Sequence, residues 1–192
     1  PVAGLRTVRD TLRPTGGIGM IVYAPLGQTG VYHAQPMLQL IAGEAPDSER
    51  IATARQLLEV LPDTNWLKRN PYVADHVDQG DAGIYDLLLH RRDRAYSVPE
   101  LTALIQQSGM RPVNFVDPAR YEPGVYLTSP ELRKRMSNLN WVQRCAFAEL
   151  LAGNMRTPIL YAVRDDNRTN TLAIPDTAET IPVMRDDDGP AL

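Results

Sequence analysis

The stretch that decides the fold reads LRPTGGIGMIVYAPLGQTGVY and runs from Leu12 to Tyr32. The residues before it repeat apolar side chains at helical spacing, which predicts a helix over residues 1–13. A turn containing Gly16 and Gly17 follows, and Ile18–Ala24 is then apolar almost throughout. Such a run is typical of a strand that is covered on both faces. A helix, a buried strand and a polar loop in succession indicate an α/β protein.

Composition narrows the class of protein. The chain has 192 residues, of which 43% are hydrophobic, enough for one globular core with or without a subdomain. A net charge of −3 gives no electrostatic footprint for nucleic acid, so a nucleic-acid partner is not expected. No run approaches the ~18 apolar residues of a membrane span, and we expect a cytoplasmic protein without a membrane partner. The single cysteine, Cys145, lies in an apolar helix pattern and is predicted to be a buried, reduced thiol.

The pattern from Gly30 to His90 is mainly helical. Helices are predicted over Val31–Ile41, from Asp47 or Ser48 to Pro62, and over Ala82–His90. This stretch is too long for an ordinary connection between a strand and the next helix, so it is interpreted as an insertion with its own small layer. Its apolar residues are expected to pack together as a helical cap near the loop Gln28–Tyr32: Leu57, Leu61, Ile84, Leu87 and Leu88.

The second half returns to alternating helices and strands. Ser97 and Glu100 form a capping-box pattern that starts a helix, and Gly109 marks its end. Strands are predicted at Val113–Val116 and Pro158–Val163, with one helix from Ser129 to about Gly153 between them. Residues 166–192 are predicted to form a polar tail.

Taken in order, these elements resemble the second half of a class I S-adenosylmethionine-dependent methyltransferase. The L-R-P-x-G-G turn precedes the fifth strand of that family. The segment Tyr23–Tyr32 is similar to the V-Y-x-x-x-G-R-T-G-V-Y segment of a bacterial subfamily with a helical insertion after strand five. Phrases like YDLLLH (Tyr85–His90) and RDRAYSVPEL (Arg92–Leu101) also occur in the insertion of that subfamily.

The resemblance implies a partial Rossmann-like sheet. Ile18–Ala24 corresponds to strand five, Val113–Val116 to strand six and Pro158–Val163 to strand seven, which runs antiparallel to the other two. Residues 1–30 and 95–165 would form the C-terminal half of the catalytic domain. Residues 31–94 would be the inserted cap, and 166–192 the tail. The chain would begin just after strand four of that fold, leaving an exposed sheet edge. That edge, or the cap, would permit homo-oligomers.

The family uses S-adenosylmethionine, which is therefore expected for the complete protein. No G-x-G-x-G loop follows a strand in this sequence, and the glycines at 16–17 and 27–30 do not fit that pattern. No residue is assigned to cofactor binding, and the chain alone is expected to bind the cofactor weakly or not at all. The methyl acceptor and the catalytic residues are not predicted.

The loop after Ala24 holds the first candidate site residues. In open α/β sheets the ligand lies beyond the carboxyl ends of the strands. Side chains there would orient a substrate nucleophile toward the methyl donor. The alternative is that the tyrosines are core aromatics. The candidates are Tyr23, Gln28, Thr29, Tyr32 and His33.

His90 is the remaining candidate. With the basic run Arg91–Arg94 it would bind an anionic group or act as a base, but a solvated helix end is the alternative. Asp75, Asp78 and Asp81 recur at helical spacing and are interpreted as a polar loop rather than paired carboxylates. The histidines lack metal-ligand spacing, so no metal site is predicted.

Two other functions remain open from the sequence. The helical insertion suits a non-catalytic cap or oligomerisation module. A capped helix, a glycine turn and a short strand, as in Tyr96–Val116, also occur in winged-helix regulators, but the acidic balance counts against DNA binding.

Overall fold

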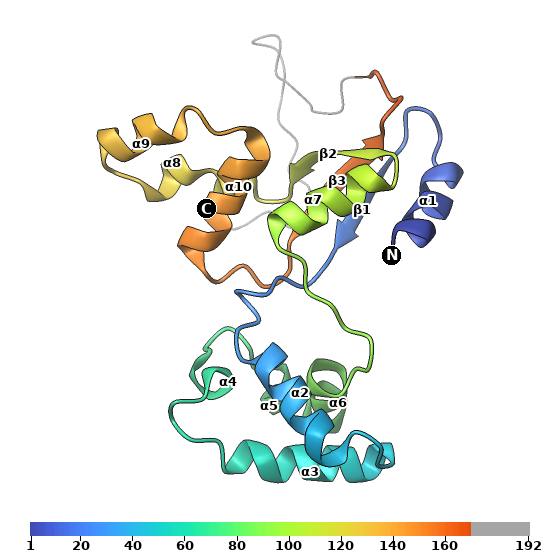
Figure 1. Cartoon of the computed structure of the whole chain (residues 1–192), viewed down its shortest axis with the longest axis vertical. Coiled ribbons are helices and arrows are strands. Elements are labelled where there is room, and N and C mark those ends of the chain that lie inside the picture. The colour runs from blue at the N-terminus through green and yellow to red at the C-terminus, as the bar shows by residue number, and fades with distance from the viewer. Residues whose placement is uncertain (170–192) are drawn as a thin grey trace, which may run out of the picture.

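A three-stranded antiparallel sheet organises one part of the molecule (Figure 1). The computed structural model describes residues 1–169. The strand order is β1 (Gly17–Ile21), β3 (Ile159–Arg164), β2 (Met110–Phe115), with β3 antiparallel to both neighbours. The prediction of one sheet with a reversed third strand is confirmed. The predicted tail lies outside the described residues from position 170 on.

Helices cover one face of this sheet and form its hydrophobic core. They are α1 (Val2–Thr11), α7 (Val98–Gln107) and α10 (Trp141–Ala152). As predicted, α7 starts with a capping box, in which the Ser97 N–H donates to Glu100 Oε2 over 2.9 Å. Gly109 ends it with a φ of 72°, in the left-handed region where a side chain would be strained. The buried residues include Leu101, Ile105, Met110, Phe115 and Leu160.

The expectation that β1 is covered on both faces is wrong. Gly17, Gly19 and Ile21 are exposed, and only Ile18 and Met20 face the core. β1 is an edge strand in the described sheet, and helices pack on one of its faces within residues 1–169. The regular strand also ends before Ala24. Its hydrogen bonding nevertheless continues, because the Ala24 N–H donates to the carbonyl of Arg156 over 2.8 Å.

The single helix predicted from Ser129 to Gly153 is also wrong. The structure has two helices, α9 (Pro130–Met136) and α10, separated by residues 137–140. Asn140 starts the second helix with its own capping box to Gln143, which satisfies amides that a continuous helix would have used internally. Two short elements precede them, the 3-10 helix η1 (Pro118–Tyr121) and α8 (Pro123–Tyr126).

Residues 31–89 contain a second hydrophobic cluster with its own helices. These are α2 (Val31–Ala42), α3 (Asp47–Glu59), α4 (Trp66–Arg69), α5 (Asp75–Asp78) and α6 (Gly80–Leu88). Leu61, Ile84, Leu87 and Leu88 are buried together with Val31, and Leu57 packs against them, as predicted. Figure 1 shows this group of helices beyond the end of β1, joined to the sheet by an outgoing and a returning segment. We call it the cap.

None of the helices in residues 1–169 has both the length and the apolar character needed to cross a membrane.

Candidate functional site

The carboxyl end of β1 is the point where the sheet meets the cap. The Tyr23 carbonyl accepts a hydrogen bond from the Tyr96 N–H over 2.8 Å, which joins the outgoing and returning segments. Burial raises the pKa of the Tyr23 phenol, and the nearby carboxylates of Asp86 and Asp93 add to this effect. The Tyr23 hydroxyl therefore stays protonated at neutral pH and can donate a hydrogen bond.

Tyr32 and Gln35, one turn apart on α2, both bind the carboxylate of Asp93. The Tyr32 hydroxyl and the Gln35 amide each donate to Asp93 Oδ2 over 3.1 Å. Gln35 also donates to the carbonyl of Leu87 over 3.0 Å, which fixes its side chain against α6. Burial, followed by the charge and hydrogen bond of Asp93, raises the pKa of Tyr32. The carboxylate is thus held in a fixed position by two donors from one helix.

The backbone of the loop between β1 and α2 packs tightly against the segment before β3 and against α4 of the cap. A Cβ on Gly27 would overlap the backbone of Met155 next to β3, and one on Gly30 would overlap the backbone of Leu67 on α4. Gly30 also has a φ of 99°. The Asn70 amide donates to the carbonyls of Gly27 (3.2 Å) and Thr29 (2.9 Å). Close backbone approach therefore requires both glycines.

Gln28 and Thr29 are held inside this loop. Gln28 is 1% exposed, and neither its amide nitrogen nor its carbonyl oxygen has a hydrogen-bond partner among the described residues. A buried amide without partners costs about 1–3 kcal/mol, so a partner such as water or a ligand group would stabilise it. The Thr29 hydroxyl is used locally, because it donates to the Leu26 carbonyl.

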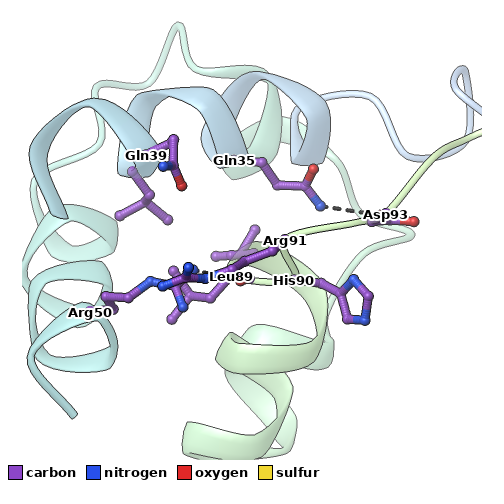
Figure 2. Close-up of a pocket in the computed structure, with 9 residues that line it drawn as sticks. Gln35, Gln39, Arg50, Leu89, His90, Arg91 and Asp93 are labelled. Carbon is purple, nitrogen blue, oxygen red and sulfur yellow. Dashed lines mark hydrogen bonds between the residues drawn. The ribbon is translucent and has the colours of Figure 1, made fainter. Parts of the chain in front are cut away.

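The two histidine candidates lie apart from the tyrosines' contacts. His33 is exposed on α2, and no side-chain hydrogen bond within residues 1–169 joins it to Tyr32 or Asp93. His90 is exposed at the rim of a cavity of about 400 Å³, and its Nδ1 accepts from the Arg92 N–H over 3.3 Å. Figure 2 shows its ring directed away from Gln39 and Arg50.

The structure brings together residues that the sequence patterns did not mark. Asp93 lies in a basic run, and only its hydrogen bond from Tyr32, 61 positions away, connects it to the candidate site. The Arg156 guanidinium binds Asp75 Oδ2 over 2.9 Å, although the two residues are 81 positions apart. Patterns along the sequence do not reveal contacts between residues so far apart in the chain.

The aspartates at helical spacing do not form a carboxylate pair. Asp75 binds Arg156, and Asp81 binds Arg55 over 2.5 Å, so these two acids serve different ion pairs. The interpretation of this region as a polar loop is only partly right, since α5 and α6 begin within it.

Comparison with known proteins gives the fold a context. No family model matches the sequence. A protein of Synechococcus sp. described only as uncharacterised is 29% identical over 155 residues, which cover 79% of this chain and 37% of that protein.

Two structures of PKMT2 from Rickettsia typhi superpose with a TM-score of 0.61 at 10% and 11% identity. They cover 88% of this chain, while the chain covers 33% and 34% of theirs. The chain has a methyltransferase-like fold. One of the PKMT2 structures is in complex with AdoHcy, the demethylated form of S-adenosylmethionine. The chain spans about a third of the length of these proteins.

Proposed function

We propose that this chain is part of an S-adenosylmethionine-dependent methyltransferase and supplies the acceptor side of its catalytic domain. The observation that carries the proposal is the cluster of Tyr23, Tyr32 and Asp93 at the carboxyl end of β1. In open α/β folds, ligands bind beyond this end of the strands. The methyltransferase-like fold and the AdoHcy bound to a similar structure support it.

The residues present fit the acceptor side rather than the cofactor side. Phenols and a carboxylate surround the end of β1, whereas the described residues offer no glycine-rich nucleotide loop. Because the chain spans about a third of the PKMT2 structures, we propose that sequence outside these 192 residues holds the cofactor. The cofactor, when bound, supplies an electrophilic methyl group.

The roles of the tyrosines and Asp93 follow from their contacts. Asp93 has one oxygen occupied by Tyr32 and Gln35, and its Oδ1 has no hydrogen bond within residues 1–169. That oxygen would accept a hydrogen bond from the nucleophile of the acceptor and take up its proton. Tyr23 would donate to the acceptor and fix its orientation. Holding the nucleophile in line with the methyl group contributes a large part of the rate in such transfers.

The test is methyl transfer by the full-length gene product with substitutions at the proposed site. Tyr32→Phe removes one donor to Asp93, and Asp93→Asn removes the proton acceptor. We expect the transfer of labelled methyl groups to acceptors in a cell extract to fall about tenfold for Tyr32→Phe. For Asp93→Asn we expect a loss of about a hundredfold. The affinity for S-adenosylmethionine should stay within about threefold of wild type.

Matched controls separate this role from a general loss of structure. Tyr85→Phe removes a hydroxyl that binds Asp47 over 3.3 Å on the outside of the cap, and Asp81→Asn breaks an exposed ion pair. Both controls should transfer methyl groups at the wild-type rate. Site variants that match the controls, or that weaken cofactor binding as much as transfer, would rule out the acceptor-side role.

A further inference from the structure

The cap contains a polar cavity of about 400 Å³, which Asp93 borders on one side (Figure 2). Its walls come from α2, from α3 and from the residues that follow α6. A cavity of this size is at the lower end of the range that binds small molecules, about 300–1,000 Å³. The side chains that define its chemistry are Gln35, Gln39, Arg50, Arg91 and Asp93.

One end of the cavity is cationic. Arg50 is only 3% exposed, and its guanidinium is fixed by Asp47 Oδ1 at 2.8 Å and by the Leu89 carbonyl at 2.6 Å. Asp47 compensates most of this charge, so Arg91 is the cation of this end that a ligand can use. Arg91 is exposed and has one long hydrogen bond, 3.5 Å to the Gly43 carbonyl, so its guanidinium can turn to a ligand with little loss.

The other end of the cavity carries one negative charge. Figure 2 shows Asp93 at the side away from Arg50, with Gln35 directed to it from α2. Tyr32 and Gln35 share the Oδ2 atom, and the described residues leave Asp93 Oδ1 without a hydrogen bond. Figure 2 shows Gln39 on α2 on the same side as Arg50, and none of the described hydrogen bonds uses its side chain.

This separation of charge selects the ligand. A simple anion would be attracted by Arg91 but repelled by Asp93. A simple cation would be attracted by Asp93 but repelled by Arg91. A ligand with a carboxylate and an ammonium group satisfies both ends. We propose that the cap cavity binds a small zwitterion of the amino-acid class, with its carboxylate on Arg91 and its ammonium group on Asp93. The cavity meets the proposed acceptor side at Gln35 and Asp93. Asp93 Oδ1 can therefore bind the ammonium group or an acceptor nucleophile, but not both at once.

The experiment uses the 192-residue chain and isothermal titration calorimetry, without any methyl transfer. Pools of free amino acids are titrated first, and the tightest single amino acid is then compared with its N-acetyl and its carboxamide derivative. We expect a dissociation constant between about 10 µM and 1 mM for the free amino acid. Each derivative lacks one charge and should bind about tenfold more weakly.

Two substitutions test the position of the site. Arg91→Gln should weaken binding about tenfold, whereas Arg92→Gln, whose side chain is exposed and does not line the cavity, should leave it unchanged. Gln39→Leu narrows the polar space and should also weaken binding, which keeps the test open if Arg91→Gln does not fold. The proposal is overturned if no amino acid binds at about 5 mM. It is equally overturned if the blocked derivatives bind as well as the free amino acid, or if the folded cavity variants bind like wild type.

Discussion

At the scale of single residues, Gly30 lies at the junction of the sheet and the cap, where the backbone leaves no room for a Cβ atom. Its φ of 99° and the approach of the Leu67 backbone both exclude a side chain. We expect Gly30→Ala to lower the free energy of unfolding by about 3 kcal/mol or more, measured by urea denaturation. Gly153→Ala is the control, since Gly153 has a φ of 67° and open space around it, and should cost about 1 kcal/mol. Equal losses would show that the Leu67 contact does not matter.

Cys145 gives a second prediction at this scale. Burial raises the pKa of its thiol to about 12, and the side chain is only 2% exposed. The reactive thiolate is therefore scarce at pH 8, so the folded chain should react with a thiol reagent far more slowly than free cysteine. Addition of urea should restore the rate. Fast labelling of the folded chain would contradict the buried position in α10.

Some residues of the candidate site could be predicted from the sequence and others could not. Tyr23 lies at the end of an apolar run and Tyr32 just beyond the loop that follows it, so the rule for strand ends marks both. Asp93 does not follow a strand and stands between arginines, and only the return of the chain from the cap brings it to Tyr32. His33 was marked by the same loop but faces solvent, because a helix turns successive side chains to different sides.

At the scale of elements, α7 depends on a carboxylate from another helix. Glu149 on α10 is 2% exposed, and its Oε2 accepts from the Val98 N–H at the start of α7 over 2.9 Å. Its Oε1 has no partner within residues 1–169. Burial raises the pKa of Glu149 above its ordinary value, an effect that the Val98 hydrogen bond opposes.

The pH dependence follows from the direction of this pKa shift. The folded state favours protonated Glu149, so the stability from this group is complete below its unfolded pKa and is lost as pH rises through the raised folded pKa. Glu149→Gln removes the titration. We therefore expect the unfolding free energy of Glu149→Gln to gain on wild type, in urea titrations, as the pH rises above the ordinary pKa of a glutamate. The exposed control Glu59→Gln should show no such gain, and a constant difference for Glu149→Gln would contradict the buried charge.

The elements also show why sequence patterns misjudge boundaries. The apolar spacing from Leu132 to Leu150 continues through the break at residues 137–140, yet these two leucines are 47% and 69% exposed. The signal for the break was local, because Asn140 and Gln143 have capping-box spacing. The three strands were predicted because each is a short apolar run between turn residues. The reversed direction of the third strand was predicted from the family resemblance. The burial of only one face of β1 was not predicted, because it depends on which elements pack against the strand.

At the scale of the whole molecule, we expect association through the edge of β1 that is unpaired within residues 1–169. Within residues 1–169 no strand pairs with this edge, and Ile21 (61% exposed) and Tyr161 (43%) lie on the open face beside it. Unpaired edges bind other chains through backbone hydrogen bonds. We expect light scattering of the 192-residue chain to show an average mass that rises with protein concentration. At the same concentrations, the Ile21→Lys variant should have a lower mass. A monomer at all concentrations would argue against association through β1.

The most direct test of the acceptor-side assignment is calorimetric titration of S-adenosylmethionine into the 192-residue chain and into the full-length gene product. The cofactor's ribose and carboxylate would be held outside these residues, and each lost hydrogen bond weakens binding by about 1 kcal/mol. We predict no binding tighter than about 1 mM for the chain and micromolar binding for the full-length gene product. Micromolar binding by the chain alone would contradict the assignment of these residues to the acceptor side.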